Sequence, residues 1–187
     1  MMSHSRTHSV FFGWSTLLLF GALLSTGCTG VRNRAELPEE ISLADRVAIA
    51  DLLARYSHTY DGRDTDAFAA LFTEDAEITV QAEPIVGRSA IRDWAADLHA
   101  KRPSGIQVRH FQTNTLLVPI DRDRVRARTM LILTWHDSAK PYGTGVRLMA
   151  TGIYQDELHR TAEGWRFFRR AADIEFPLEP AFRRESR

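Results

Sequence analysis

The side chains that can carry chemistry in this chain are carboxylates, imidazoles and hydroxyls. Its 187 residues include seven histidines and 24 Asp or Glu, but a single cysteine, Cys28. One thiol cannot form an internal disulfide, a cysteine-based zinc site or an iron–sulfur cluster, because each needs more than one. The spacing of the histidines and carboxylates predicts no metal site either. These residue types favour proton transfer, in which an imidazole takes or gives a proton beside a carboxylate.

The composition and net charge indicate a globular domain that does not bind nucleic acid. Apolar residues make up 44% of the chain and charged residues 26%, which is typical of a globular domain. Lys plus Arg and Asp plus Glu each number 24, so the formal net charge is zero. A chain without a basic field lacks the charge that holds nucleic acid by its phosphates, so we expect no nucleic-acid partner.

The first 27 residues have the pattern of an export signal. Residues 1–9 are polar with one arginine, and residues 10–24 are uncharged and dominated by Phe, Leu and Trp. These are the n-region and h-region of a secretory signal peptide. Fifteen helical residues span about 22 Å, short of the roughly 30 Å of a bilayer core, so a stable transmembrane helix is the weaker alternative.

The segment LSTGC at residues 24–28 resembles the lipobox of bacterial lipoproteins, which implies lipid attachment at Cys28. The alternative is an ordinary signal peptide in which this cysteine is incidental. Residues 28–40 have almost no apolar content and are expected to form a flexible tether. We therefore expect a protein of the cell envelope, anchored by lipid to a bacterial membrane and facing the periplasm or the exterior.

Apolar residues at helical spacing predict three helices before Pro103. The first begins at Ser42 with a capping box, carries Val47 on its apolar face, and ends at Gly62, which suits a left-handed cap. A short second helix follows directly. The third begins at Ser89 and ends before the proline.

Strands dominate the rest of the chain. Residues 73–75 predict a turn and residues 77–80 a short strand. Four longer strands follow with short connections, at residues 108–118, 125–135, 146–158 and 165–174. Short connections require mostly antiparallel pairing, because parallel strands need long crossovers. The pattern predicts an α+β fold in which one curved sheet wraps around about three N-terminal helices.

Four stretches of the sequence carry a family resemblance: YSHTYDGRDTDAFAALFTEDAEI, GRSAIRDW, HFQTN and GWRFFRR. They resemble the SnoaL-like branch of the nuclear transport factor 2-like superfamily, over residues 41–175. The resemblance implies a cone-shaped fold with an internal pocket, and it leaves residues 176–187 as a C-terminal tail. That superfamily contains dehydratases, isomerases and cyclases as well as proteins without catalysis, so the fold alone does not fix the function.

The resemblance also implies site residues. In dehydratase-like members, a tyrosine and an aspartate five residues later near the end of the first helix line the pocket with a strand histidine. These positions match Tyr56, Asp61 and His110. The resemblance implies that Asp61 and His110 form an acid/base pair facing each other across an apolar pocket, while Tyr56 supports a developing enolate oxygen. Such chemistry needs no cofactor and no metal.

Each of these three residues also has a purely structural interpretation. Asp61 can cap the turn before Gly62, Tyr56 can be a core residue, and His110 can be a buried histidine with satisfied hydrogen bonds. Further residues expected to line the pocket are Tyr60, Asn114, Thr129 and Trp165.

Two functions remain open from the sequence. The first is a cofactor-independent lyase or isomerase that acts on a small hydrophobic ring-containing molecule. The second is a non-catalytic small-molecule-binding or structural accessory lipoprotein. The strand after Arg128 carries no ionisable side chain until His136, whereas the related dehydratases have a further acid or histidine there, and this favours the second function.

The residues at 130–133 are apolar on both alternating faces of their predicted strand. Antiparallel sheets commonly have one covered face and one available face. We therefore expect a homodimer that packs through the outer face of the sheet.

Overall fold

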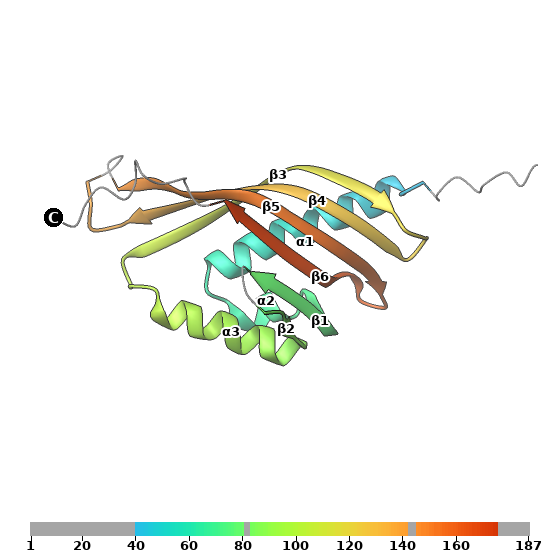
Figure 1. The fold of residues 1–187 in the computed structure, drawn as a ribbon, viewed down its shortest axis with the longest axis horizontal. Helices are drawn as coiled ribbons and strands as arrows, with labels where there is room; N and C mark the ends of the chain where they lie inside the picture. The colour runs from blue at the N-terminus through green and yellow to red at the C-terminus, as the bar shows by residue number, and fades with distance from the viewer. Residues whose placement is uncertain (1–39, 81–82, 142–144, 176–187) are drawn as a thin grey trace, which may run out of the picture. The chain divides into compact units, whose positions relative to one another are not determined.

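The computed structural model describes residues 40–80, 83–141 and 145–175 (Figure 1). The expected signal peptide, Cys28, nearly all of the expected tether and the tail at 176–187 lie outside the described residues, and the predictions made for them stay predictions.

Three helices are present among the described residues: α1 (Leu43–Asp61), α2 (Thr65–Ala69) and α3 (Arg88–Lys101). Ser42 caps α1 as predicted, because its Oγ accepts a hydrogen bond from the backbone N–H of Asp45 at 3.1 Å. No helix in the described part of the chain combines the length and the apolar content needed to cross a membrane.

The structure corrects three details of the helices. Val47 is 62% exposed and does not belong to the buried face of α1. Gly62 has a right-handed backbone (φ −74°), and the left-handed residue is its neighbour Arg63 (φ 63°). Glycine is needed at position 62 for space, since a Cβ there would lie 2.8 Å from the carbonyl oxygen of His58. The third helix begins one residue before Ser89, after Gly87 (φ 94°), without a side-chain cap.

The six strands of the described residues lie in one sheet: β1 (Phe72–Val80), β2 (Ile85–Val86), β3 (Ile106–Pro119), β4 (Arg124–Asp137), β5 (Val146–Thr161) and β6 (Gly164–Glu175). Their order across the sheet is β2-β1-β6-β5-β4-β3. Every pair is antiparallel except β1 with β6, so the expected mostly antiparallel α+β fold is confirmed.

The predicted turn at residues 73–75 is wrong, because this segment belongs to β1. Phe72 is fully buried and pairs with Phe167 of β6, which draws the start of the strand into the sheet. The register shifts between Phe72 and Glu77. The polar residues that predicted a turn therefore lie at an irregularity within the strand.

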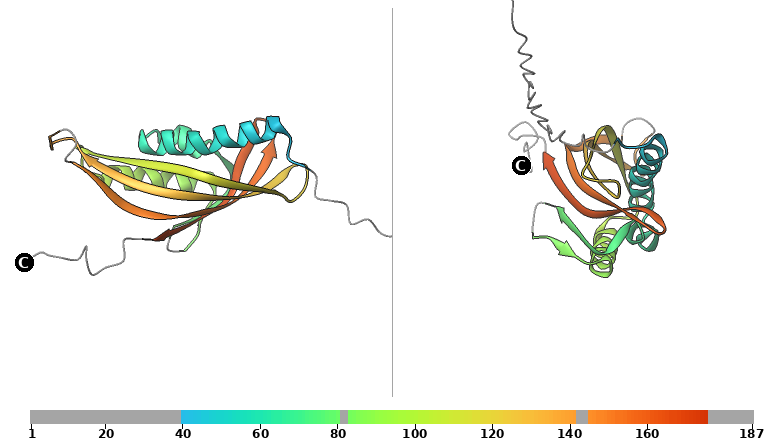
Figure 2. Two further views of the ribbon diagram at one scale, coloured as in Figure 1. Left: turned by 90° about the horizontal axis from the view of Figure 1, so that it is seen from above. Right: turned by 90° about the vertical axis from the view of Figure 1, so that its right-hand side faces the viewer.

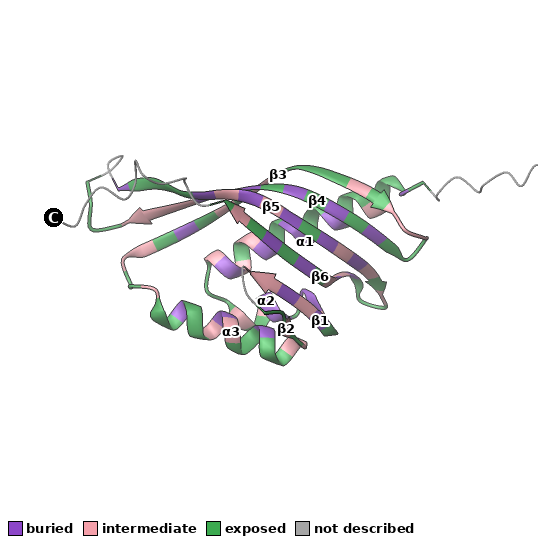
Figure 3. Cartoon of the chain, in the orientation of Figure 1, coloured by how far each residue is buried: buried purple, intermediate pink, exposed green. Residues whose placement is uncertain are grey.

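The sheet bends around α1, which lies along its concave face (Figure 2). This helix packs against β3 and β6, while α3 packs against β1, β2 and α2. Burial alternates along the strands (Figure 3). In β4 the inward residues are Val125, Ala127, Thr129, Leu131 and Leu133, and the residues between them are exposed.

Candidate functional site

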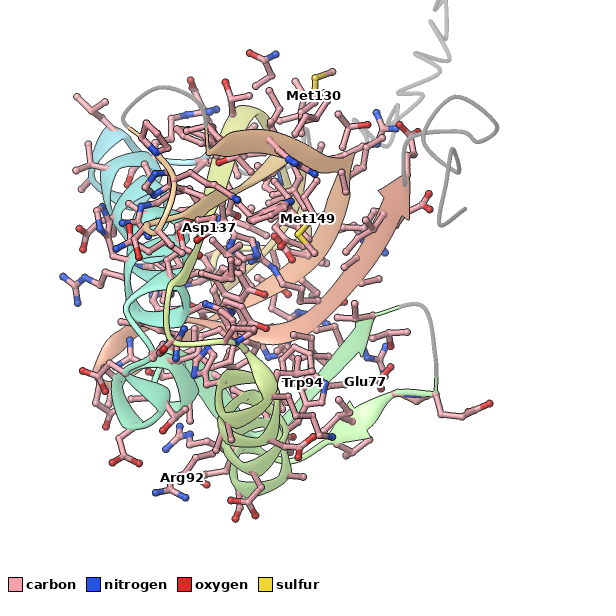
Figure 4. The ribbon with its side chains drawn as sticks, turned by 90° about the vertical axis from the view of Figure 1, so that its left-hand side faces the viewer. Glu77, Arg92, Trp94, Met130, Asp137 and Met149 are labelled. Atoms are coloured by element: carbon pink, nitrogen blue, oxygen red, sulfur yellow. The ribbon has the colours of Figure 1, made fainter. Side chains whose placement is uncertain are left out.

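A cavity of about 540 Å³ lies on the concave side of the sheet. Its lining comes from α1, α3 and all the strands except β2, and it is mostly apolar: Tyr56, Tyr60, Val80, Trp94, Leu98, Arg102, Ile106, Val108, His110, Leu133, Trp135, Met149, Tyr154 and Ile174. Figure 4 looks at the end of the molecule where Trp94 of α3 and Met149 of β5 lie. A concave, largely apolar site with few polar groups is the usual form of a small-molecule pocket.

His110, which lines this cavity, forms a closely bonded pair with Asp61. One carboxylate oxygen of Asp61 lies 2.6 Å from Nδ1 of His110, and the other accepts the backbone N–H of the same residue at 2.9 Å. Each side chain is 8% exposed. Because a carboxylate only accepts hydrogen bonds, Nδ1 carries the proton, and Nε2 has no hydrogen-bond partner among the described residues.

The fold brings the two residues together from distant parts of the chain. Asp61 is the last residue of α1, and His110 lies on β3, the strand against which that helix packs. The pair is therefore adjacent, and the expectation that the two residues face each other across the pocket is corrected. A more polar depression is lined by both residues together with Ser57, His58, Gly62, Arg63, Ser104, Ile106, Gln107, Arg109 and Phe111.

Tyr56 and Tyr60 are both buried and both line the cavity, as predicted for this helix face. Their rings stack at 6.3 Å between centroids, and each meets the His110 ring edge-on, at 6.2 and 5.1 Å. Burial raises the pKa of Tyr56, and the nearby Arg170 opposes that shift. The Tyr56 phenol therefore keeps its proton at neutral pH and can act as a hydrogen-bond donor.

Sequence reasoning missed a buried charged network next to the cavity. Arg170 and Asp156 are bonded by two hydrogen bonds of 2.7 and 2.8 Å, and both side chains are completely buried. The guanidinium of Arg170 lies 4.0 Å from the ring centroids of Tyr56 and Tyr154 and donates to Gln112 at 3.0 Å. The signal in the sequence was a polar residue, Asp156, at an inward position of a strand pattern.

The structure does not bring three other predicted residues to the cavity. Asn114 is exposed and donates to the sulfur of Met130, because a left-handed residue (φ 53°) and a register shift break the alternation of β3 at this point. Thr129 is fully buried against the hydroxyl of Thr115 at 3.1 Å. Trp165 is buried beside the start of α1, where its indole N–H donates to Asp45.

The inner face of β4 carries no ionisable side chain between Thr129 and Leu133. The ionisable groups inside the fold come from β5 and β6 instead, as Asp156 and Arg170. No cluster of three or more His, Cys, Asp or Glu suited to a metal ion occurs within residues 40–80, 83–141 and 145–175.

Comparison with known families and structures gives a clear assignment of the fold. The family model for the SnoaL-like domain matches residues 42–171. No curated protein matches the chain. A proposed aromatic ring hydroxylase from Novosphingobium aromaticivorans is 28% identical, with a TM-score of 0.63 over 75% of this chain and 95% of that one.

Two further solved structures are similar. A protein of unknown function from Mycobacterium tuberculosis is 28% identical, with a TM-score of 0.62 over 72% of this chain and 78% of that one. A protein from Catenulispora acidiphila, whose structure was determined in complex with S-DNPA, is 21% identical, with a TM-score of 0.61 over 71% of this chain and 95% of that one. The similarity to the Catenulispora acidiphila protein concerns the fold alone. The expected nuclear transport factor 2-like fold is confirmed.

Proposed function

This chain belongs to the SnoaL-like family, and on that premise we propose that it is a cofactor-independent enzyme that moves a proton on a small hydrophobic ring compound. The observation that carries the proposal is the His110–Asp61 pair at the wall of a mostly apolar cavity. Asp61 fixes the ring and the tautomer of His110, so that Nε2 is the free base. The reaction class is that of a dehydratase or isomerase.

Each residue has one role in the proposed step. His110 Nε2 takes a proton from a carbon next to a carbonyl, the electrons of the C–H bond form the enolate double bond, and the carbonyl electrons move to oxygen. The Tyr56 hydroxyl donates to that oxygen, and the apolar lining strengthens both interactions by excluding water. Return of the proton to a different atom isomerises the compound. Transfer of the proton from His110 to a neighbouring hydroxyl, whose C–O bond breaks as the enolate electrons form a C=C bond, dehydrates it and releases water.

Exchange of carbon-bound hydrogen tests this proposal without knowledge of the natural substrate. We expect the protein to accelerate deuterium uptake next to the carbonyl of 2-tetralone in D₂O, followed by proton NMR. His110→Gln should lose that acceleration by about 10²-fold or more, the usual size of a general-base contribution. His58→Gln alters an exposed histidine of the same region and is the matched control. Exchange no faster than in buffer, or equal in His110→Gln, would rule out the catalytic role.

One observation favours the second candidate function, a non-catalytic binding protein. The inner face of β4 lacks the further acid or histidine that the related dehydratases carry, so His110 is the one imidazole, and there is no carboxylate, in the described lining of the cavity. The tetralone experiment separates the two functions. Binding of the compound, detected by quenching of the cavity tryptophans, with no exchange would identify a binding protein.

We also retain the cell-envelope location and the homodimer as proposals. The location rests on the signal-like residues 1–27 and on Cys28. The homodimer rests on the exposed apolar side chains of the sheet, which include Phe111 (53% exposed) and Met130 (49% exposed). An exposed apolar face of this kind is typical of a surface that another protein covers.

A further inference from the structure

Arg102 places a positive charge in the lining of the apolar cavity. It follows α3 directly and is half-buried, and its guanidinium carbon lies 5.5 Å from the centroid of the Tyr60 ring. Its Nη1 is buried and has no hydrogen-bond partner within the described residues. A buried guanidinium nitrogen without a protein partner favours a ligand that accepts a hydrogen bond from it.

No carboxylate in the described lining neutralises this charge. The lining residues include neither Asp nor Glu, and Asp61 is already occupied by two bonds to His110. Two other arginines of this region have their own partners. Arg63 donates to the carbonyl oxygens of Pro103 and Ile106, and Arg170 is paired with Asp156.

The charge of Arg102 affects the pKa of the neighbouring His99. His99 is buried against Tyr60, with 4.8 Å between the ring centroids. Burial lowers the pKa of His99, and the charges of Arg102 and Arg63 lower it further. His99 therefore adds no second positive charge at neutral pH.

We propose that the cavity binds hydrophobic ring compounds that carry a carboxylate, with Arg102 as the residue that recognises the carboxylate. A guanidinium fork matches a carboxylate in charge and geometry, and such a bond is among the stronger hydrogen bonds of proteins. The apolar lining holds the ring. This inference names the substrate class of the proposed enzyme, so it rests on the same cavity.

Arg102 and His110 lie near the same tyrosine ring, so a carboxylate bound by Arg102 would orient the ligand toward His110. The guanidinium of Arg102 and the ring of His110 lie within 5.5 Å and 5.1 Å of the same ring centroid, that of Tyr60. A ring compound whose carboxylate is bound by Arg102 therefore lies in the same cavity that His110 lines, against the same tyrosine ring. Holding a substrate in a fixed orientation beside a catalytic group lowers the barrier of the reaction.

Two probes of equal shape test the inference. The full chain is titrated with 2-naphthoate and with 2-naphthamide, and binding is followed by calorimetry. We expect the carboxylate to bind at least tenfold more tightly than the amide, and Arg102→Gln to remove that preference, mainly by weakening the binding of the carboxylate. A tenfold change is the lower end for one lost hydrogen bond to a charged group. Arg102→Lys should retain part of the preference, since it keeps the charge without the fork.

Arg92→Gln is the matched control, because Arg92 lies on α3, the helix that Arg102 follows, pairs with Asp66 at the surface and is directed away from the sheet (Figure 4). It should bind both probes as the unaltered chain does. Equal binding of the two probes by the unaltered chain, or an unchanged preference in folded Arg102→Gln, overturns the inference. The tetralone exchange uses a neutral compound, so these outcomes leave the test of the proposed function independent.

Discussion

Arg170 and Asp156 meet across two neighbouring strands with both side chains fully buried and two hydrogen bonds between them. Burial raises the pKa of Asp156, and Arg170 opposes this shift by favouring the charged form. The guanidinium also lies on the faces of Tyr56, Tyr154 and Phe167, at 4.0 to 4.2 Å from their centroids. The ion pair therefore holds the tyrosines that line one side of the cavity.

We expect Asp156→Leu to lower the free energy of unfolding by about 3–5 kcal/mol, because it leaves the Arg170 cation buried without its partner. The double variant Asp156→Leu/Arg170→Met should recover much of this loss, since it buries no charge. Urea denaturation measures both. A double variant as unstable as the single one would show that packing, and not the unpaired charge, decides the loss.

Asp61→Ala should destabilise the protein by about 1–3 kcal/mol, because it leaves the backbone N–H of His110 buried without an acceptor. The same change should abolish the preference of His110 for a proton on Nδ1, which proton–nitrogen NMR detects directly. Asp51→Ala removes an exposed carboxylate of the same helix, paired with Arg55, and should change stability by less than about 1 kcal/mol. A tautomer identical in Asp61→Ala and the unaltered chain would contradict the proposed role of Asp61.

His99 should make stability depend on pH. Burial, followed by the charges of Arg102 and Arg63, lowers its pKa in the folded state below the ordinary 6.5. The unfolded chain then binds a proton that the folded chain does not, so the contribution is complete above pH 6.5 and is lost as the pH falls below it. We expect His99→Phe to reduce the stability difference between pH 8 and pH 5, measured by urea denaturation, with exposed His58→Phe as the control.

The proposed homodimer is tested on the outer face of the sheet. We expect the unaltered chain to sediment as a dimer at micromolar concentration and Met130→Glu to sediment as a monomer, because a charge on the covered face would be buried without a partner. Leu43→Glu changes a residue that is 78% exposed at the start of α1 and should leave the dimer intact. A monomeric unaltered chain would refute the dimer.

The proposed anchor is tested at Cys28. In the bacterial cell, Cys28→Ser should move the protein from the membrane fraction to the soluble fraction and remove the acyl mass from its mature N-terminus. Stable anchoring by acyl chains depends on buried methylene groups, so loss of the attachment atom removes the whole effect. Membrane association that survives this substitution, or an unmodified cysteine in the unaltered protein, would disprove lipidation.

Local patterns in the sequence predicted much of the fold. The Ser42 cap and the strand at residues 125–135 follow from short-range rules, and both are present. The site depended on features that these rules do not contain. A strict alternation along β6 from Trp165 and Phe167 would direct Arg169 inward, but the register shift beside Leu158 buries Arg170 instead. Similarly, the bulge in β3 turned Asn114 away from the face that holds His110.

The parallel pairing of β1 with β6 has a consequence for how the protein assembles during synthesis. The first long strand of the chain joins the sheet through the last strand, and β2 joins it only through β1. A nascent chain that ends before Gly164 therefore has all three helices and five strands but no neighbour for β1 other than β2. Pairing over so long a separation is slow to form. We therefore expect the cavity to form only after β6 has been synthesised. A chain that lacks β6, through premature termination or proteolysis, should not form the cavity at all.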